Sequence, residues 1–153
     1  MSATTRIPEP FVDLVECPPV AALTTITRDG YPQTSVVWCD LERGSERDLV
    51  RVNTMAAFAK ARNMARDPRV TLLCYDPREP LRCIEIRGAV VEMTEDGAAA
   101  HLDAIASKYM GRPARYFGDC IPARFAETEL PLLCRIRPDR IVASDWTGGE
   151  GER

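Results

Sequence analysis

Residues 53–64 carry the clearest chemical pattern in the chain, because small polar side chains stand where a predicted strand gives way to a predicted helix. The segment reads Asn-Thr-Met-Ala-Ala-Phe-Ala-Lys-Ala-Arg-Asn-Met. Unpaired N–H groups and a partial positive charge gather at the start of a helix, and they favour the binding of phosphate. Lys60 and Asn63 lie three residues apart on one predicted helical face, where Lys60 could contact an anion and Asn63 could donate a hydrogen bond. An ordinary capped helix with a solvated basic face would explain the same residues.

A second pattern lies at residues 33–38, in a segment that predicts a half-buried strand. Alternation places Gln33 and Ser35 on one face of this strand and Trp38 on the other. One face could offer hydrogen bonds to the edge of a ring, and the other face could offer an aromatic wall. The alternative is a barrel strand with Trp38 packed in the core.

The chain is poor in catalytic groups of its own. His101 is its only histidine and lies within a predicted helix with no obvious partner, so we expect a structural or surface role. None of the six cysteines forms a C-x-x-C pair, and most lie in apolar runs, which predicts small buried hydrophobic groups and no metal site. The pattern identifies no catalytic residue. If the protein is an enzyme, a bound cofactor must supply the reactivity.

Length and charge narrow the class of protein. The 153 residues fit a single domain over 1–153, with a core over about 18–143 and a flexible tail over 144–153. The net charge of −3 argues against a general nucleic-acid binder, since neutralising phosphates requires a basic surface. No apolar run resembles a signal peptide or reaches the roughly 20 residues that span a membrane. We therefore expect a cytoplasmic protein without nucleic-acid or membrane partners.

The elements that position these residues predict an α+β protein. Helices are expected over 56–66 and 94–110, with Thr54 as the cap of the first. Gly30 predicts a tight hairpin, and Gly88 predicts a bulge or bend. Six strands are expected, over residues 20–27, 32–41, 48–53, 70–75, 82–93 and 132–142. Hairpin connections, with helices inserted after the third and fifth strands, favour an antiparallel barrel flanked by helices.

Four segments together resemble the pyridoxamine-phosphate-oxidase-like superfamily, the FMN-binding split β-barrel proteins. The segments are Pro32-Gln33-x-Ser35-x-x-Trp38, Asn53-Thr54-Met55-x-x-Phe58-x-Lys60-x-Arg62-Asn63-Met64-x-Arg66-Asp67-Pro68-Arg69-Val70, Glu85-Ile86-Arg87-Gly88 and Arg135-Ile136-Arg137-Pro138. Their order and spacing extend over about residues 18–143, and they are most similar to the branch that uses the deazaflavin coenzyme F420. The resemblance implies a six-stranded antiparallel split β-barrel that forms a homodimer, with cofactor sites at the subunit interface.

The resemblance also implies which residues bind the cofactor. They are Asn53, Thr54, Met55 and Lys60 at the phosphate end, Gln33, Ser35 and Trp38 near the tricyclic ring, and Arg82 from the partner subunit's segment 76–82. The chain departs from its relatives in one respect. Relatives often carry extra basic residues around the phosphate helix, where this chain has alanine at 56, 57 and 59. Binding would then depend on backbone N–H groups, Lys60 and Arg62, or the cofactor differs.

The implied activity is that of an F420-dependent oxidoreductase. Hydride would pass between the reduced deazaflavin and a conjugated small-molecule acceptor, with the protein supplying orientation and a dry site. One alternative keeps the fold and replaces the cofactor with FMN, which gives a pyridoxamine-phosphate-oxidase-like flavoprotein. Another is a non-catalytic cofactor-binding protein, which the alanine-rich helix and the lack of catalytic groups would also allow.

Overall fold

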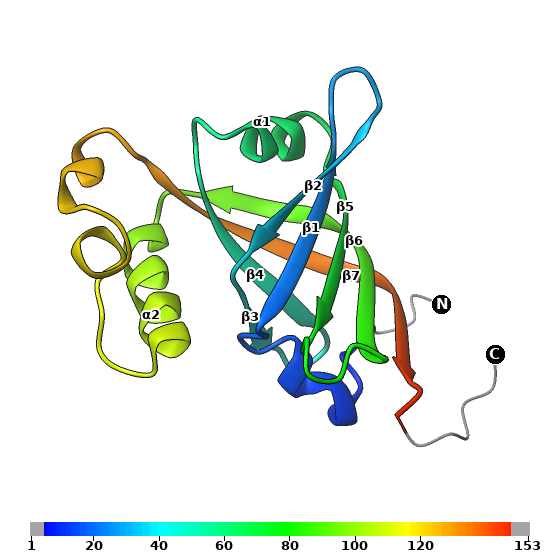
Figure 1. Ribbon diagram of the computed structural model, residues 1–153. Helices are drawn as coiled ribbons and strands as arrows, with labels where there is room; N and C mark the ends of the chain where they lie inside the picture. The colour runs from blue at the N-terminus through cyan, green and yellow to red at the C-terminus, as the bar shows by residue number, and fades with distance from the viewer. Residues whose placement is uncertain (1–4, 148–153) are drawn as a thin grey trace.

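One antiparallel sheet of seven strands dominates the computed structural model, which describes residues 5–147 (Figure 1). The strands are β1 Val20–Ile26, β2 Pro32–Val37, β3 Cys39–Arg43, β4 Asp48–Met55, β5 Arg69–Tyr75, β6 Arg82–Thr94 and β7 Pro131–Asp145. Their order across the sheet is β2-β1-β5-β6-β7-β4-β3. With its few helices outside the sheet, the protein has the predicted α+β class.

The two edge strands, β2 and β3, follow each other in the chain with only Trp38 between them. Val37 pairs with β1, whereas Cys39 pairs with β4, so the chain leaves one edge of the sheet and enters the other at this residue. The sheet must therefore curl until its edges approach each other here, as Figure 1 shows. The single strand predicted over 32–41 is wrong. The described sheet has seven strands instead of six, and its two edges are not paired into a closed barrel.

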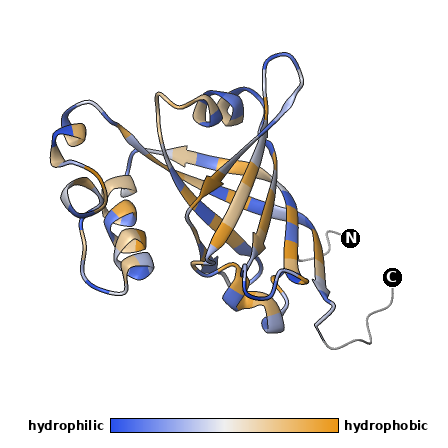
Figure 2. Cartoon of the chain, in the orientation of Figure 1, coloured by the Kyte–Doolittle hydropathy of each residue, from blue (hydrophilic) through white to orange (hydrophobic). Residues whose placement is uncertain are grey.

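Apolar residues recur along the strands (Figure 2), and the burial of alternate positions places the apolar face inside the curled sheet. Val50, Val52, Ile84 and Ile86 are all buried there, as the sequence predicts. Three cysteines share this core, namely Cys39, Cys74 and Cys134, while Cys17, Cys83 and Cys120 are partly exposed. The expectation of buried cysteines therefore holds for half of them.

The segment before β1 covers one end of the sheet. It forms a 3₁₀ helix over Glu9–Leu14, and the Ile7 N–H before it donates to Asp48 Oδ2 at 2.9 Å. Ile7 and Val15 are buried in the same core as the strands. The core therefore begins before residue 18, earlier than the sequence suggests.

Two α-helices lie outside the sheet. Helix α1, Ala59–Arg66, lies across the end of the sheet opposite the 3₁₀ helix, and α2, Ala98–Met110, lies beside the sheet (Figure 1). Helix α2 starts four residues later than 94 and ends at Gly111, whose φ of 66° suits glycine. None of the described helices is both long enough and apolar enough to cross a lipid bilayer.

Helix α1 also begins later than expected. Strand β4 continues to Met55, and the Ala56 N–H donates to the Leu130 carbonyl at 2.8 Å, so pairing with the β7 side holds this segment extended. Thr54 is therefore a buried strand residue. It caps no helix, and α1 starts at Ala59 without a side-chain cap.

The irregularity predicted at Gly88 is confirmed. Gly88 in β6 lies opposite Pro138 in β7, where the register between the two strands shifts. A Cβ atom at Gly88 would lie 2.1 Å from the Arg137 carbonyl oxygen, so only glycine fits. Pro138, which lacks an N–H, is tolerated at this point because the ladder is already interrupted.

The C-terminal end differs from the expected flexible tail over 144–153. Strand β7 continues to Asp145, and the Trp146 N–H donates to the Leu81 carbonyl at 3.2 Å. The chain is therefore still part of the sheet at residue 144. The last part of the expected tail, 148–153, lies outside the described residues.

Candidate functional site

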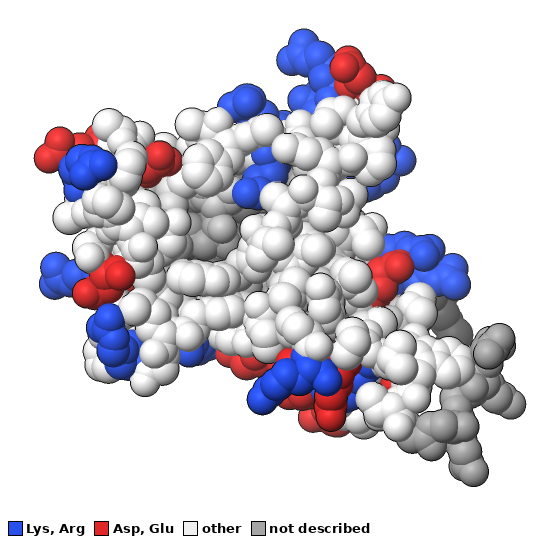
Figure 3. Space-filling model, viewed as in Figure 1, with Lys and Arg blue, Asp and Glu red and all other residues white. Residues whose placement is uncertain are grey.

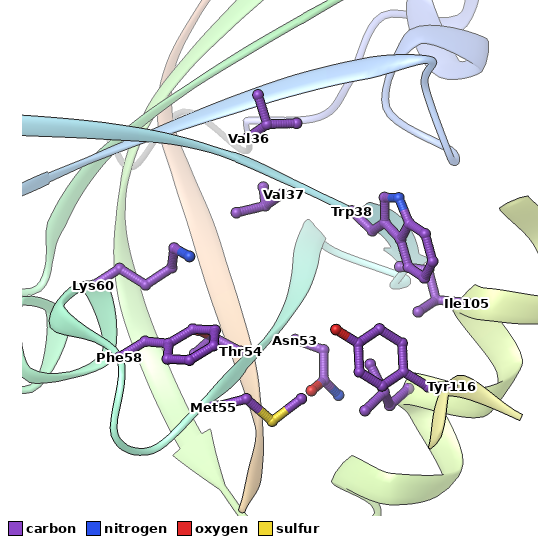
Figure 4. Close-up of a pocket in the computed structure, with 11 residues that line it drawn as sticks. Val36, Val37, Trp38, Asn53, Thr54, Met55, Phe58, Lys60, Ile105 and Tyr116 are labelled. Carbon is purple, nitrogen blue, oxygen red and sulfur yellow. The ribbon is translucent and has the colours of Figure 1, made fainter. Parts of the chain in front are cut away.

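A cleft of about 230 Å³ opens between the β2–β3 junction, β4, α1 and α2 (Figure 3). We call it the Lys60 cleft. Its lining residues are Val36, Val37, Trp38, Asn53, Thr54, Met55, Phe58, Lys60, Leu102, Ile105 and Tyr116 (Figure 4). The structure thus brings together five residues that the sequence singles out, namely Trp38, Asn53, Thr54, Met55 and Lys60.

Lys60 brings an unneutralised positive charge into the cleft. Its side chain is half-buried, and this burial lowers the pKa of the ammonium group below its ordinary value. Across residues 5–147, no carboxylate oxygen lies within 4.0 Å of Lys60 Nζ, which stands 5.2 Å from the centroid of the Phe58 ring. A partly desolvated cation without a counter-ion is a natural contact point for an anion.

Two buried oxygens of the residues that line the cleft have no hydrogen-bond partner. They are Asn53 Oδ1 and Thr54 Oγ1. In the described part of the chain, the remaining buried oxygen of this kind is Asp48 Oδ1, which lies 3.2 Å from Arg43 Nε and is therefore ion-paired. An unpaired buried polar atom costs about 1–3 kcal/mol, and native proteins rarely keep one without a reason such as a ligand or a water. The unpaired groups thus coincide with the cleft.

An aromatic cluster forms the wall of the cleft opposite Lys60. The Trp38 ring stacks on Tyr109 with centroids 4.8 Å apart and meets Tyr116 edge-on at 6.0 Å. Trp38 is only half-buried and belongs to this outer cluster, so the alternative that places it in the barrel core is wrong. The wall can pack against a flat ring, because aromatic pairs favour such stacked and edge-to-face contacts.

Tyr116 is a cleft residue to which the sequence pattern assigns no role. It lies in a π-type turn over Tyr116–Cys120 that a 3₁₀ helix, Ala123–Glu127, follows. Figure 4 shows its hydroxyl pointing into the cleft from the side opposite Lys60. Burial raises the pKa of Tyr116 above the ordinary tyrosine value, so the hydroxyl keeps its proton at neutral pH. The adjacent aromatic pair Tyr116-Phe117, within an irregular segment, was the only signal that could have identified it.

Asn63 does not line the cleft with Lys60 within one protomer, so a contact of Asn63 with an anion that Lys60 holds stays a prediction. Asn63 is buried against the sheet, where its Nδ2 donates to Gln33 Oε1 at 2.8 Å and to Thr25 Oγ1 at 3.1 Å. Arg66 donates to Asn63 Oδ1 at 3.0 Å. Asn63 and Gln33 therefore bind each other and hold α1 to the strands, outside the Lys60 cleft.

Ser35 and Arg82 also lie away from the cleft within one protomer. Ser35 belongs to the β1–β2 ladder and does not line the cleft. Arg82 is ion-paired with Asp13 at 2.7 Å, and its guanidinium lies over the Phe11 ring near the 3₁₀ helix. A contact of either residue with a cofactor in the cleft therefore stays a prediction that requires a second subunit.

His101 is buried and has partners that the sequence does not reveal. Its Nε2 lies 3.1 Å from Asp40 Oδ1, and its Nδ1 lies 3.2 Å from Asn53 Nδ2. Asp40 also accepts hydrogen bonds of 2.8 and 2.7 Å from Arg51, and Lys108 Nζ lies 3.5 Å away. Burial alone would raise the pKa of Asp40, but hydrogen bonds from His101 and Arg51 outweigh it and hold this pKa well below its usual range. We call Asp40, Arg51, His101 and Lys108 the Asp40 network.

Fold and cleft together define an α+β protein whose Lys60 cleft combines a half-buried cation with an aromatic wall. The chain belongs to the pyridoxamine 5'-phosphate oxidase family, whose model matches residues 7–131. The superfamily that the sequence motifs resemble is therefore confirmed. A search of curated proteins finds no match.

Solved structures show the same fold. One is an F420 reductase, with a TM-score of 0.71 and 24% identity, over 89% of this chain and 98% of that one. Another is a conserved hypothetical protein from Mycobacterium tuberculosis, with a TM-score of 0.69 and 26% identity, over 99% of this chain and 93% of that one. The chain is similar to both along nearly its whole length.

Proposed function

We propose that this protein is an oxidoreductase that binds the deazaflavin coenzyme F420 in the Lys60 cleft and passes a hydride between it and a conjugated small molecule. The observation that carries the proposal is the half-buried Lys60, without a carboxylate partner in the described chain, beside the unpaired Asn53 Oδ1 and Thr54 Oγ1. Membership of the pyridoxamine 5'-phosphate oxidase family and the likeness to an F420 reductase support it.

The residues of the cleft fit such a cofactor at both of its ends. Lys60 would hold the phosphate by charge, as a compact ammonium group does well. Trp38 and the apolar side chains of α2 would pack against the ring and exclude water. Tyr116 holds a proton on its hydroxyl, which it could donate in a hydrogen bond within the cleft. When bound, the deazaflavin supplies the hydride chemistry that the chain's own side chains lack.

FMN is the competing cofactor, because it also joins a phosphate to a tricyclic ring. The family match favours it, since members of this family bind flavins. The Lys60 argument applies equally to both cofactors, so the choice between them rests on the likeness to the F420 reductase.

A second copy of the chain would complete the site. The cleft holds about 230 Å³, less than the roughly 300–1,000 Å³ of a pocket that encloses a drug-sized ligand. Paired residues of neighbouring strands form a row on the outward face of the sheet, namely Val36, Ala22, Leu73, Glu85 and Val142. Three apolar side chains of this row are exposed: Val36 by 70%, Leu73 by 37% and Val142 by 40%. Val36 also lines the cleft. A homodimer that buries this row would therefore border the cofactor site, where the partner subunit could contribute Arg82.

Sedimentation of a Leu73→Arg variant tests the homodimer. We expect the wild type to sediment as a dimer and the variant as a monomer that binds cofactor more weakly. Val91→Arg is a matched control, since Val91 is 48% exposed but lies at the register shift of β6, outside the row and outside the segment 76–82. A wild-type monomer that binds cofactor at full strength would contradict the dimer part of the proposal.

Fluorescence titration with F420 and with FMN tests the binding site. We expect Lys60→Ala to weaken binding of the preferred cofactor by about 10- to 100-fold, because a charge-assisted contact contributes on the order of 1–3 kcal/mol. Lys108→Ala is the control, since it removes the chain's other lysine, which is paired with Glu16 and does not line the Lys60 cleft. Equal affinity in wild type and Lys60→Ala would remove the basis of the proposal.

Turnover distinguishes an enzyme from a cofactor carrier. The protein loaded with reduced F420 should oxidise it when a conjugated acceptor, such as an enone or a quinone-like ring, is added. Tight retention of the cofactor without turnover over a broad panel of acceptors would instead favour a non-catalytic cofactor-binding protein.

A further inference from the structure

The side-chain amide of Asn53 is fixed in one of its two possible orientations. Its Nδ2 donates to the Ala98 carbonyl of α2 at 2.9 Å. A half-turn of the amide would bring Oδ1 against that carbonyl oxygen, and two acceptors repel each other. The amide nitrogen therefore faces α2, and Oδ1, which is buried without a partner, faces away from it (Figure 4).

His101 fixes the same orientation from a second side. Asn53 Nδ2 can only donate, so His101 Nδ1, at 3.2 Å from it, must accept and carries no proton. The ring proton then lies on Nε2, 3.1 Å from Asp40 Oδ1. Asp40 receives two hydrogen bonds from Arg51 and is an acceptor only. The carboxylate and the amide thus favour the same tautomer of one imidazole.

We propose that His101 and Asp40 are positioning residues that lock the Asn53 oxygen toward the Lys60 cleft, so that the cleft selects ligands with an N–H or O–H donor at this point. The inference rests on the proposed function, because it takes this cleft as the ligand site. It goes further by assigning a task to the chain's only histidine and a hydrogen-bonding requirement to the ligand.

The ligand requirement follows from the pairing of the amide. Both hydrogens of Asn53 Nδ2 are used within the protein, so Asn53 offers a ligand an acceptor and no donor. A ring N–H, as in an imide, or a hydroxyl satisfies this acceptor, whereas a carbonyl or carboxylate placed there is repelled. The cleft is therefore divided into a cationic part at Lys60, for the ligand's anion, and an acceptor part at Asn53, for the ligand's donor.

The tautomer can be observed directly, because a single histidine gives an unambiguous nitrogen spectrum. Long-range ¹H–¹⁵N correlation on the wild-type protein without cofactor should show a protonated Nε2 and a bare Nδ1 at neutral pH. A proton on Nδ1, alone or together with Nε2, would overturn the proposal. This measurement needs no variant and no bound cofactor.

Two substitutions separate positioning from simple packing. In His101→Asn the new carbonyl can still accept from Asn53, whereas in His101→Gln the new amide can still donate to Asp40 but leaves Asn53 without its acceptor. We expect His101→Asn to keep cofactor affinity within about threefold of wild type, and His101→Gln to lose about tenfold, as the loss of one hydrogen bond predicts. Lys108→Met, which alters the surroundings of Asp40 without touching Asn53, is the control.

The outcomes distinguish this inference from the proposed function. Equal losses in both His101 variants, measured by fluorescence titration on folded protein, would reduce His101 to a packing role and overturn the inference alone. If the wild type binds neither F420 nor FMN, the proposed function fails, and the nitrogen spectrum still decides the arrangement of His101 and Asn53.

Discussion

The Asp40 network and the Lys60 cleft lie on either side of Asn53, and they differ in how completely their polar groups are paired. In the network, Asp40 is 1% exposed and is contacted by His101, Arg51 and Lys108. In the cleft, Lys60 has no carboxylate within 4.0 Å in the described chain, and Thr54 Oγ1 has no partner. Asn53 joins the two, with its nitrogen paired in the network and its oxygen unpaired beside the cleft.

In the network, buried polar groups pair with one another and stabilise the fold. In the cleft, buried polar groups lack partners within the described part of the protein, which leaves them for a ligand to satisfy. Burying a polar group costs free energy unless it is hydrogen-bonded, and burying a charge costs more. The network meets this condition from within the chain. The cleft does not meet it. Folding has already removed water from Lys60, Asn53 and Thr54, so a ligand that pairs with them would not have to remove that water on binding.

Asp40→Ala should have the largest effect of any change at these two regions. It leaves His101 and Arg51 without their buried acceptor, and breaking a buried pair by removing one partner costs about 3–5 kcal/mol. We expect the free energy of unfolding, measured by urea titration, to fall by about that amount. Lys108→Ala, which removes a half-exposed partner, should cost no more than about 1 kcal/mol. Similar losses of unfolding free energy in the two variants would mean that Asp40 is not the buried centre on which the network depends.

Acid should weaken the network before it affects the cleft. The folded-state pKa of Asp40 lies below that of the unfolded chain, which is about 3.9. The unfolded state therefore binds more protons at low pH, so the stabilisation from Asp40 is present above about pH 4 and is lost as the pH falls. The free energy of unfolding should decline less steeply with acid in Asp40→Asn than in wild type. Asp29→Asn, which removes an exposed carboxylate in the turn between β1 and β2, should leave the slope nearly unchanged.

Most of the strands could be predicted because their signals are local. The alternation of Val50 and Val52, the left-handed Gly30 and the close approach at Gly88 each depend on neighbouring residues and hold in the structure. The break at Trp38 could not be predicted in this way. It exists because two different strands pair with the residues on either side of it, and those strands are distant in the chain.

The site was predictable only in part, for the same reason. Lys60 and Asn53 stand out by residue type, and the cleft contains both. The partners of His101 come from β3 and β4, 61 and 48 residues away, and no periodicity reveals such contacts. Asn63 has the spacing of an anion ligand, but tertiary contact with Gln33 decides where its side chain lies.

Thr54→Val should stabilise the protein without cofactor and weaken the complex. The substitution keeps the shape of the side chain and removes a buried hydroxyl that has no partner. We expect the free energy of unfolding to rise by about 1 kcal/mol, since an unsatisfied buried polar group costs about 1–3 kcal/mol. Cofactor affinity should fall in the same variant. A loss of stability would show that the hydroxyl is already satisfied, for example by a water, and would weaken the contrast between the two regions.

The smallest expected effect concerns the chain's two lysines, because Lys60 lies in the cleft and Lys108 lies in the network. Burial lowers the pKa of Lys60, whereas the hydrogen bond to Glu16 raises the pKa of Lys108 above the ordinary value. After ¹³C-methylation of the lysines, NMR titration should find Lys60 losing its proton at a lower pH than Lys108, with the signals assigned by a Lys108→Arg variant. Saturation with cofactor should then raise the pKa of Lys60 alone, because a phosphate beside the ammonium group favours its charged form. If the two lysines have the same pKa and the cofactor does not change that of Lys60, the Lys60 charge is already neutralised within the protein. The cleft would then attract an anion no better than the Asp40 network does.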